Sequence, residues 1–237
     1  MKTEHQRTAL ITGANKGIGK EIARQLARRG FAVFIGARDM VKGREAAEEL
    51  CREGYEATFI QLDVTDPVSV KNATGTFSQK ASHLDVLVNN AAALGDHGED
   101  IVKLNAEMLD RTLKTNVNGP ILVTQDFLPY LEKSPNGGRI INVSSGAGSL
   151  SRMGTYAPAY SISKTALNAV TKQFAGALQA QNIAVNCVDP GWVRTDMGGA
   201  NANRSVEEGA DTVVWLATDA PQTETGKFWH DRRETDW

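Results

Sequence analysis

The sequence predicts a single-domain α/β protein with a doubly wound parallel sheet of about seven strands and helices on both faces. Short apolar runs typical of strands alternate along the chain with helical patterns, and this alternation produces parallel pairing through right-handed crossovers. The unusual residues of the chain stand directly after these apolar runs. Because the carboxyl ends of parallel strands meet at one edge of a sheet, residues far apart in the sequence are expected to form a single cleft.

Bulk composition fits one globular domain over residues 1–237. Hydrophobic residues make up 41% and charged residues 23% of the chain, and the formal net charge is −2. This balance gives no reason to expect nucleic acid or an anionic membrane as a partner. No apolar run reaches the roughly 18 residues of a membrane span. Residues 1–7 are polar and lead straight into a strand, so no signal peptide is expected.

The cysteines and histidines indicate neither a disulfide nor a metal site. Cys51 and Cys187 each lie in a periodic segment and are interpreted as packed thiols. The four histidines have no ligand spacing, so no metal is expected. A reducing, cytoplasmic location fits these features.

The first element is a short β-type run over residues 8–12, which leads into a glycine-rich turn. The turn reads G-A-N-K-G-I-G over residues 13–19, and the helix after it ends at Gly30. Glycines let the backbone approach a phosphate, and a new helix points free N–H groups at the anion. The spacing differs from the usual G-x-G-x-x-G fingerprint, but its place between strand and helix favours a phosphate cradle.

A second apolar run, residues 31–37, ends at Arg38. In a dinucleotide fold an acid at this point bonds the ribose diol of the cofactor, whereas an arginine accommodates a 2′-phosphate. Lys16 in the neighbouring turn adds a second cation. A solvated surface arginine is the alternative, but the two cations together favour the phosphate.

The middle of the chain continues the alternation of helices and strands. A helix is expected over residues 41–52, a strand over 57–62 before Asp63, and a helix from Pro67, which suits a first helical position. The next strand covers residues 84–88 and ends at Asn89. Residues 94–101 are interpreted as a mobile loop. A long helical pattern over residues 107–131 follows, with Pro120 as an expected kink beside Asn116.

The candidate catalytic residues stand around the fifth strand, residues 140–143. This strand ends in Ser144 and Ser145, and an alanine-rich helical pattern begins near Tyr160 and Lys164. Residues four apart share one face of a helix, so the ammonium is expected to lower the pKa of the phenol. Tyr160 is therefore a candidate proton donor. A lone Y-x-x-x-K is more often a surface pair, so this interpretation depends on the other motifs.

A sixth strand over residues 183–188 leads to the turn at Pro190. Residues 196–205 are rich in glycine and asparagine and are predicted to be a flexible substrate loop. A last helix over residues 206–217 and a short run over 227–229 complete the predicted fold.

These motifs together resemble the short-chain dehydrogenase/reductase family, in its compact single-domain branch. The resemblance covers nearly all of the chain and rests on T-G-A-N-K-G-I-G from Thr12, D-V from Asp63, N-N-A from Asn89, Asn116, Ser145, Tyr160-x-x-x-Lys164 and P-G from Pro190. The glycine turn, the G-A-R-D of residues 36–39 and the C-terminal G-K-F-W-H-D-R-R-E-T-D-W resemble carbonyl reductases within that family.

The resemblance implies a Rossmann-type fold and NADPH-dependent reduction of a ketone, aldehyde or quinone. It makes Tyr160 the acid that protonates the carbonyl oxygen and Ser145 the hydroxyl that orients the substrate, with Ser144 the weaker candidate. Lys164 is expected to hold the nicotinamide ribose, and Asn116 to support a water-mediated proton path to Lys164. The residues expected to bind the cofactor are Gly13, Asn15, Lys16, Gly17, Ile18, Gly19, Arg38, Asp63, Val64, Asn89, Tyr160, Lys164, Pro190, Gly191, Val193 and Thr195.

Two departures from the family pattern are visible. The motif N-N-A-G reads N-N-A-A at residues 89–92, and only 14 residues separate Ser145 from Tyr160. Vertebrate carbonyl reductases carry an extra segment before the tyrosine, so their monomeric state is not implied here, and a homodimer or homotetramer is expected. Two alternative functions stay open: a 3-oxoacyl-thioester reductase of lipid synthesis, and a non-catalytic NADP-sensing protein.

Overall fold

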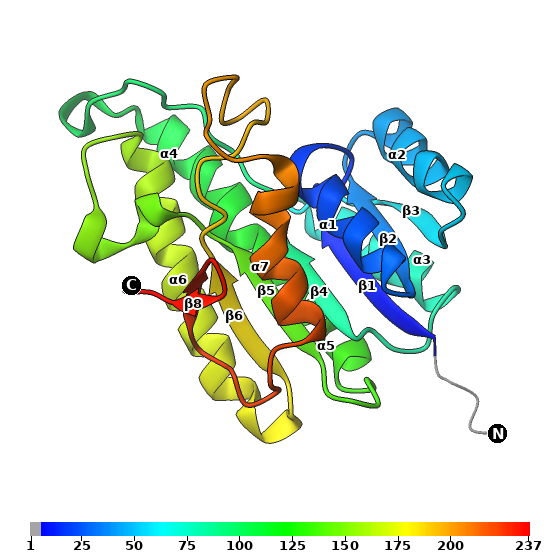
Figure 1. Ribbon diagram of the computed structural model, residues 1–237. Coiled ribbons are helices and arrows are strands. Elements are labelled where there is room, and N and C mark those ends of the chain that lie inside the picture. Colours follow the sequence, from blue (N-terminus) through cyan, green and yellow to red (C-terminus); the bar gives the residue numbers. More distant parts are fainter. Residues whose placement is uncertain (1–5) are drawn as a thin grey trace.

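The computed structural model describes residues 6–237, and its strands form one eight-stranded sheet in the order β3-β2-β1-β4-β5-β6-β7-β8 (Figure 1). The pairs from β3 through β7 are all parallel, and β8 alone is antiparallel to its neighbour β7. The doubly wound α/β prediction is confirmed. The eighth strand, which was not predicted, is only two residues long.

The strands and helices follow the predicted order closely. The strands are β1 Arg7–Thr12, β2 Phe31–Ala37, β3 Ala57–Gln61, β4 Val86–Asn89, β5 Arg139–Val143, β6 Ala184–Val188, β7 Phe228–His230 and β8 Arg233–Glu234. The α-helices are α1 Gly17–Arg28, α2 Met40–Arg52, α3 Pro67–Ser78, α4 Ala106–Leu113, α5 Gly119–Leu131, α6 Pro158–Leu178 and α7 Val206–Thr218. Short 3₁₀ helices cover Ile101–Lys103, Gly146–Gly148, Leu150–Arg152 and Gln179–Gln181.

Each face of the sheet has its own apolar core because neighbouring residues of a strand point to opposite faces. In β1, Ile11 packs into the core beneath α1, α2 and α7, whereas Leu10 packs into the core beneath α3, α5 and α6. All residues of β2 and β6 are buried, as expected for parallel strands covered on both faces. The apolar runs of the sequence are therefore the strands at the centre of the molecule.

The strand order reverses direction between β1 and β4, and this point brings distant segments together. Asn90, just after β4, donates from Nδ2 to the carbonyl oxygens of Thr12 at 2.9 Å and Gly13 at 3.2 Å. In sheets of this kind the crevice at such a reversal is where ligands bind. The glycine turn, the N-N-A motif and the serine pair after β5 all lie at the carboxyl ends of neighbouring strands.

The predicted long helix over residues 107–131 is divided into α4 and α5. A five-residue π-helical stretch, Lys114–Asn118, joins them, and the N–H of Gly119 donates to the carbonyl of Lys114. Pro120 is the next residue and has no N–H to give, which disfavours the ordinary α-helical ladder here. Asn116 lies inside this wider turn.

The remaining predictions from composition have mixed outcomes. Cys187 is buried, but Cys51 is an exposed free thiol at the end of α2, so the packed interpretation was wrong for Cys51. Among residues 6–237, none of the helices has the length and apolar character that a membrane span requires. In the same part of the chain, no three His, Cys, Asp or Glu side chains are grouped to hold a metal ion. Residues 1–5 of the polar N-terminal segment lie outside the described residues.

Candidate active site

Tyr160 lies in the first turn of α6 with its phenol almost completely buried. Burial raises the pKa of Tyr160 to about 12, and a hydrogen bond from the Ser145 side chain acts in the opposite direction. The nearby charge of Asp189 raises the pKa further. The phenol is therefore protonated at neutral pH, which is the form that a proton donor needs.

Lys164 follows one turn later on the same helix and is only 2% exposed. Its Nζ donates to the carbonyl of Val143 at 2.8 Å and lies 5.5 Å from the centroid of the Tyr160 ring. Burial lowers the pKa of Lys164 to about 7. The expectation that Lys164 lowers the pKa of Tyr160 is wrong for this structure, because desolvation dominates both groups and weakens the positive charge of the lysine.

The serine pair after β5 is divided between two roles. The hydroxyl of Ser144 is buried, where it donates to Asn168 Oδ1 at 2.6 Å and to the carbonyl of Lys164 at 3.3 Å. Ser145 is partly exposed, and its hydroxyl accepts from the N–H of Ala147 at 3.2 Å. Ser144 therefore fastens β5 to α6, and Ser145 lies beside Tyr160.

The side chain of Asn116 is fully buried and occupied by contacts within the protein. Its Oδ1 accepts from the N–H of Ala93 at 2.7 Å, and its Nδ2 donates to the carbonyl of Ala93 at 2.9 Å. Nδ2 also donates to Ser163 Oγ at 2.9 Å, and Ser163 in turn donates to the carbonyl of Tyr160 at 2.7 Å. The amide of Asn116 thus links the loop after β4 to α6.

The glycine turn after β1 has the backbone that a phosphate cradle needs. Gly13 and Gly17 have φ values of +64° and +56°, which disfavour any side chain. A Cβ at Gly19 would lie 2.4 Å from Asn90 Nδ2, so this glycine is required where the turn contacts the end of β4. The helix α1 begins at Gly17 with no side-chain cap, which leaves its first N–H groups available to an anion. These residues fit the pyrophosphate of a dinucleotide.

The corner between β1 and β2 carries the predicted cations. Arg38 is exposed at the end of β2, and the next residue, Asp39, caps α2 by accepting from Val41 N and Lys42 N at 3.1 Å. Lys16 forms an exposed ion pair with Asp196, with 2.6 Å between Nζ and Oδ2. A surface cavity of ≈ 320 Å³ includes Lys16 but not Arg38; its lining is Asn15, Lys16, Lys20, Lys42, Glu45, Ala46, Glu49 and Asp196.

The residues predicted to contact the adenosine lie after β3 and β4. Asp63 Oδ1 accepts from the N–H of Thr65 at 2.9 Å and so closes the turn after β3. Val64 is buried against Gly119, where an added Cβ would lie 2.9 Å from Val64 Cγ2. Asn89 is buried and donates to Asn142 Oδ1 at 2.9 Å. The side chains of Asp63 and Asn89 therefore organise the sheet edge.

The segment after β6 folds back over the glycine turn. Gly191 takes a φ of +76°, and Val193 pairs with Arg204 in an isolated bridge. The side chain of Thr195 lies close to Gly17, since a Cβ at Gly17 would be 3.3 Å from Thr195 Cγ2. The cofactor residues predicted in the second half of the chain therefore lie beside those predicted in the first half, as the strand order requires.

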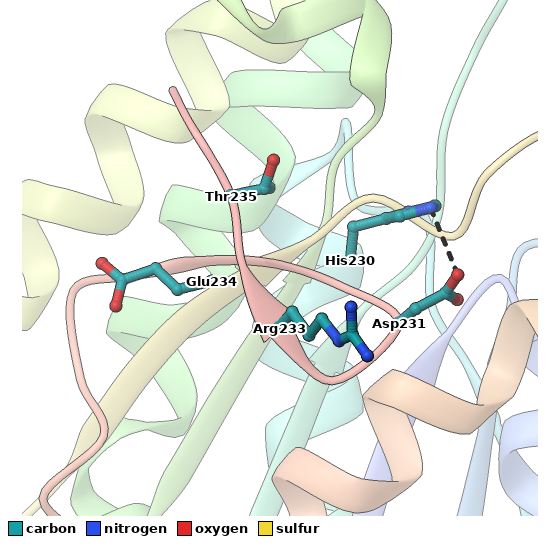
Figure 2. A pocket seen from close by; sticks show the side chains of 5 residues that line it. All are labelled: His230, Asp231, Arg233, Glu234 and Thr235. Carbon is teal, nitrogen blue, oxygen red and sulfur yellow. Dashed lines mark ion pairs between the residues drawn. The ribbon is translucent and has the colours of Figure 1, made fainter.

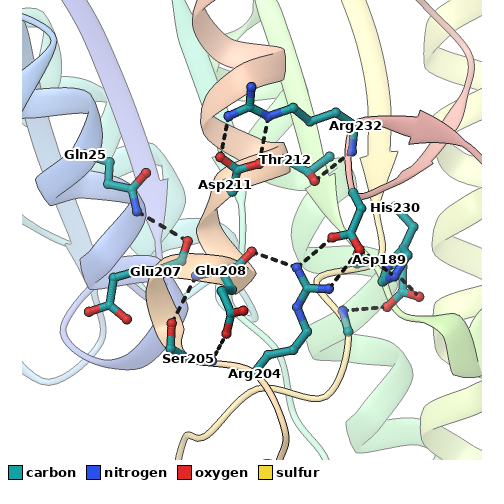
Figure 3. A network of polar contacts seen from close by, with 12 residues as sticks. Gln25, Asp189, Arg204, Ser205, Glu207, Glu208, Asp211, Thr212, His230 and Arg232 are labelled. Carbon is teal, nitrogen blue, oxygen red and sulfur yellow. Dashed lines mark hydrogen bonds and ion pairs between the residues drawn. The ribbon is translucent and has the colours of Figure 1, made fainter.

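A polar network fixes the far end of the 196–205 segment (Figure 3). Arg204 Nη2 lies 2.6 Å from Asp231 Oδ1, and Ser205 and Glu208 form a reciprocal capping box at the start of α7. These contacts tie the segment to α7 and to the turn after β7. The flexibility predicted for residues 196–205 stays a prediction.

A second surface pocket lies at the C-terminal hairpin formed by β7 and β8. It has a volume of ≈ 440 Å³ and is lined by His230, Asp231, Arg233, Glu234 and Thr235 (Figure 2). Its lining includes an ion pair of 3.5 Å between His230 Nε2 and Asp231 Oδ2. None of these residues was predicted to bind cofactor or substrate.

Asp189 is a buried acid beside the site that the motif analysis did not assign to the chemistry. Its Oδ1 accepts from the N–H of Gly191 at 2.9 Å, and its Oδ2 lies 3.4 Å from His230 Nδ1. An added Cβ at Gly146 would be 2.8 Å from Oδ2, so the carboxylate lies against the segment that follows Ser145. The sequence did carry a signal for this residue. Asp189 stands directly after an apolar strand, as the other predicted site residues do.

Comparison with known proteins gives consistent matches along nearly the whole chain. The sequence model of the family described as short chain dehydrogenase matches residues 7–220. Carbonyl reductase [NADPH] 1 of Mus musculus is 33% identical over 276 residues, covering 97% of this chain and 98% of the relative. Salutaridine reductase of Papaver somniferum is 31% identical over 295 residues, covering 94% of each. Both alignments are longer than the 237 residues of this chain, so each relative carries residues without a counterpart here.

Solved structures agree with the sequence matches. The NADPH-bound carbonyl reductase from chicken fatty liver superposes with a TM-score of 0.87 at 30% identity, covering 98% of this chain and 99% of the other. A putative short chain dehydrogenase from Escherichia coli CFT073, complexed with NADPH, gives a TM-score of 0.86 at 27% identity and covers 94% of this chain and 95% of that one.

Proposed function

Because the chain belongs to the short-chain dehydrogenase family, we propose that it reduces the carbonyl of an apolar ketone, aldehyde or quinone to an alcohol, with Tyr160 as proton donor. The protein is an NADP-dependent oxidoreductase, and NADPH is its cofactor. The observation that carries the proposed reaction is the protonated, buried phenol of Tyr160 beside the hydroxyl of Ser145.

The chain's own residues provide the binding site. When bound, NADPH supplies the hydride that reduces the carbonyl carbon. The uncapped start of α1 and the backbone at Gly13 and Gly17 would hold the pyrophosphate. The cations Lys16 and Arg38 would hold the 2′-phosphate. Asp39 is the nearby acid that could select a ribose diol instead, but its carboxylate caps α2.

Proton transfer follows from the environment of the phenol. The carbonyl oxygen of the substrate accepts a hydrogen bond from Ser145 and the proton from Tyr160. The raised pKa keeps that proton on the phenol until an oxyanion develops beside it. Lys164, whose Nζ lies 5.5 Å from the ring centroid of Tyr160, would hold the nicotinamide ribose.

An apolar substrate is supported by the side chains on the surrounding loops. Met153, Tyr156, Trp192 and Met197 are exposed although they are large and apolar, and they belong to the segments that precede α6 and follow β6. Exposed apolar side chains gathered near one site are typical of a binding surface.

Turnover assays with Tyr160→Phe test the proposal. We expect NADPH to bind the variant with nearly normal affinity, while kcat with simple ketones, aldehydes and quinones falls by roughly 10² or more, because only the hydroxyl is lost. Tyr130→Phe is the matched control, since Tyr130 lies on α5 and packs against Phe77. Near-normal kcat in Tyr160→Phe contradicts the assignment of the acid.

The same assay distinguishes the alternative functions. Turnover of a 3-oxoacyl thioester with poor activity on free ketones identifies a reductase of lipid synthesis. Binding of NADPH with no oxidation across the whole panel identifies a non-catalytic sensor. Either result contradicts the proposed reaction.

We further propose that the protein is a homodimer or homotetramer that pairs through α6. Ile162, Ala169 and Gly176 lie seven residues apart on one exposed face of this helix, and small residues let a partner helix approach closely. Sedimentation at micromolar concentration is expected to give an oligomer for the wild type and a smaller species for Ala169→Arg. A monomeric wild type contradicts the proposal.

A further inference from the structure

Asp96 is an unusual residue in the loop that follows β4. Residues 91–100 contain no helix or strand, and Asp96 alone among them is buried, with no exposed surface at all. A carboxylate is costly to remove from water unless other groups compensate the charge. The apolar neighbour Leu94 is more exposed than this acid. Burial of Asp96 therefore calls for a specific contact.

That contact is the beginning of the catalytic helix. Asp96 Oδ2 accepts from the N–H of Ala159 at 2.6 Å and from the N–H of Tyr160 at 3.3 Å. The first N–H groups of a helix have no partner within the helix, and the positive end of its dipole favours an anion. Asp96 thus caps α6 from 63 residues away and bonds directly to the backbone of Tyr160.

No local residue can take over this cap. The residue at the N-cap position of α6 is Ala157, which has no polar side chain and takes a left-handed conformation with φ of 44°. By contrast, a local side chain caps α2, α3 and α7. The start of the helix that carries Tyr160 is therefore held by the loop after β4.

A second contact from the same loop reaches the segment before α6. His97 Nδ1 lies 2.8 Å from the hydroxyl of Tyr156. The other oxygen of Asp96, Oδ1, is buried without a hydrogen-bond partner among the described residues. Because Oδ1 has no partner, the cap that Oδ2 makes on α6 is the contact that accounts for a carboxylate at this buried position.

We propose that Asp96 is a positioning residue that fixes the backbone of Tyr160 for proton donation. The inference rests on the proposed role of Tyr160 as the acid. Displacement of a reacting group by about 1 Å can cost on the order of 10² in rate. Loss of the cap allows the first turn of α6 to fray, and the phenol then leaves its place beside Ser145.

Substitution of Asp96 tests this role. In Asp96→Ala we expect kcat to fall by roughly ten- to a hundredfold, while the Kd of NADPH, measured by fluorescence, changes by less than about threefold. Asp96→Asn should recover most of the activity, because asparagine is nearly as good a cap as aspartate. Asp100→Ala is the matched control: Asp100 lies in the same loop and caps only the 3₁₀ helix Ile101–Lys103.

Hydrogen exchange is a readout of the cap that does not depend on activity. Hydrogen exchange of the peptide that contains the Ala159 and Tyr160 amides should be faster in Asp96→Ala and unchanged in Asp100→Ala. If Asp96→Ala does not fold, Asp96→Leu removes both carboxylate oxygens and still fills the buried space that the side chain occupies. The same loss of kcat is then expected.

A double variant separates this inference from the proposed function. If Asp96 acts through Tyr160, Asp96→Ala should lower kcat in the wild type but not further in the Tyr160→Phe background. Equal losses in both backgrounds, normal kcat in Asp96→Ala, or unchanged exchange of the two amides overturns the inference. Normal kcat in Tyr160→Phe itself overturns the proposed function instead.

Discussion

The buried amine of Lys164 is expected to make the stability of the cofactor-free protein depend on pH. Burial lowers its pKa to about 7 from an ordinary value of 10.5. Between these two values the unfolded chain holds one proton more than the folded protein. The free energy of unfolding therefore rises with pH across this window, by about 1 kcal/mol for each pH unit. Below pH 7 the lysine is protonated in both states and its contribution no longer changes.

Urea denaturation at pH 7, 8 and 9, on wild type and Lys164→Met, measures this effect. Methionine is unbranched, fills similar space and does not titrate in this range. The difference in unfolding free energy between the two proteins should change by about 2 kcal/mol in favour of the wild type from pH 7 to 9. This slope is the quantity to compare, because the substitution itself shifts both stabilities by a constant amount.

Two other buried groups titrate in the opposite direction but do not obscure the comparison. Burial raises the pKa of Tyr160 to about 12 and also raises the pKa of Cys187. An acidic group whose pKa is raised in the folded protein lowers the free energy of unfolding as the pH rises above its ordinary pKa. That ordinary pKa is near 9 for the thiol and 10 for the phenol. Both ordinary values lie at or above the upper end of the pH 7–9 range, so these two groups contribute little to the comparison. Parallel pH dependence in wild type and Lys164→Met refutes the reasoning.

Substitutions of Arg38, Gly148 and Pro120 test other parts of the site. Arg38→Asp should lower the preference for NADPH over NADH, measured as the ratio of kcat/KM values, and an unchanged ratio contradicts the phosphate role. In Gly148→Ala the new Cβ would lie 2.7 Å from the backbone and Cβ of Lys164, so we expect a loss of about 1–3 kcal/mol in urea denaturation and a lower kcat. Gly154→Ala is its control, because nothing lies within 4 Å of that Cβ. Pro120→Ala restores an N–H after the π-helical stretch and should lower kcat while NADPH affinity, followed by fluorescence, changes little.

The fold was predictable because its signals are local. Strand runs such as residues 31–37 are continuous and apolar, since both faces of the sheet are covered, and Pro67 and Gly30 mark helix ends where the structure has them. The order of alternation then determines which ends meet. The gathering of the glycine turn, Ser145 and Tyr160 at one edge follows from this topology alone.

The rest of the site depends on contacts that no local pattern records. The cap from Asp96 to Tyr160 joins residues 64 positions apart, and the loop sequence around Asp96 resembles any polar turn. The pKa of Lys164 depends on how completely the helix is covered, which spacing on a helix does not reveal. Ser144 and Ser145 are adjacent residues of the same type, so the sequence does not distinguish them. The structure does, because only Ser144 donates to Asn168 Oδ1.

The central place of β1 has a consequence for synthesis of the chain. One edge of β1 pairs with β2, but its other edge pairs with β4, whose residues come 77 positions later in the register. A nascent chain that has completed β3 at Gln61 therefore exposes the edge of an entirely apolar Ala9-Leu10-Ile11 run until Asn89 has been added. At ordinary translation rates that interval lasts on the order of a few seconds. A fragment that ends before Val86 is expected to aggregate through this edge, and the growing chain on the ribosome has the same vulnerability until β4 covers it.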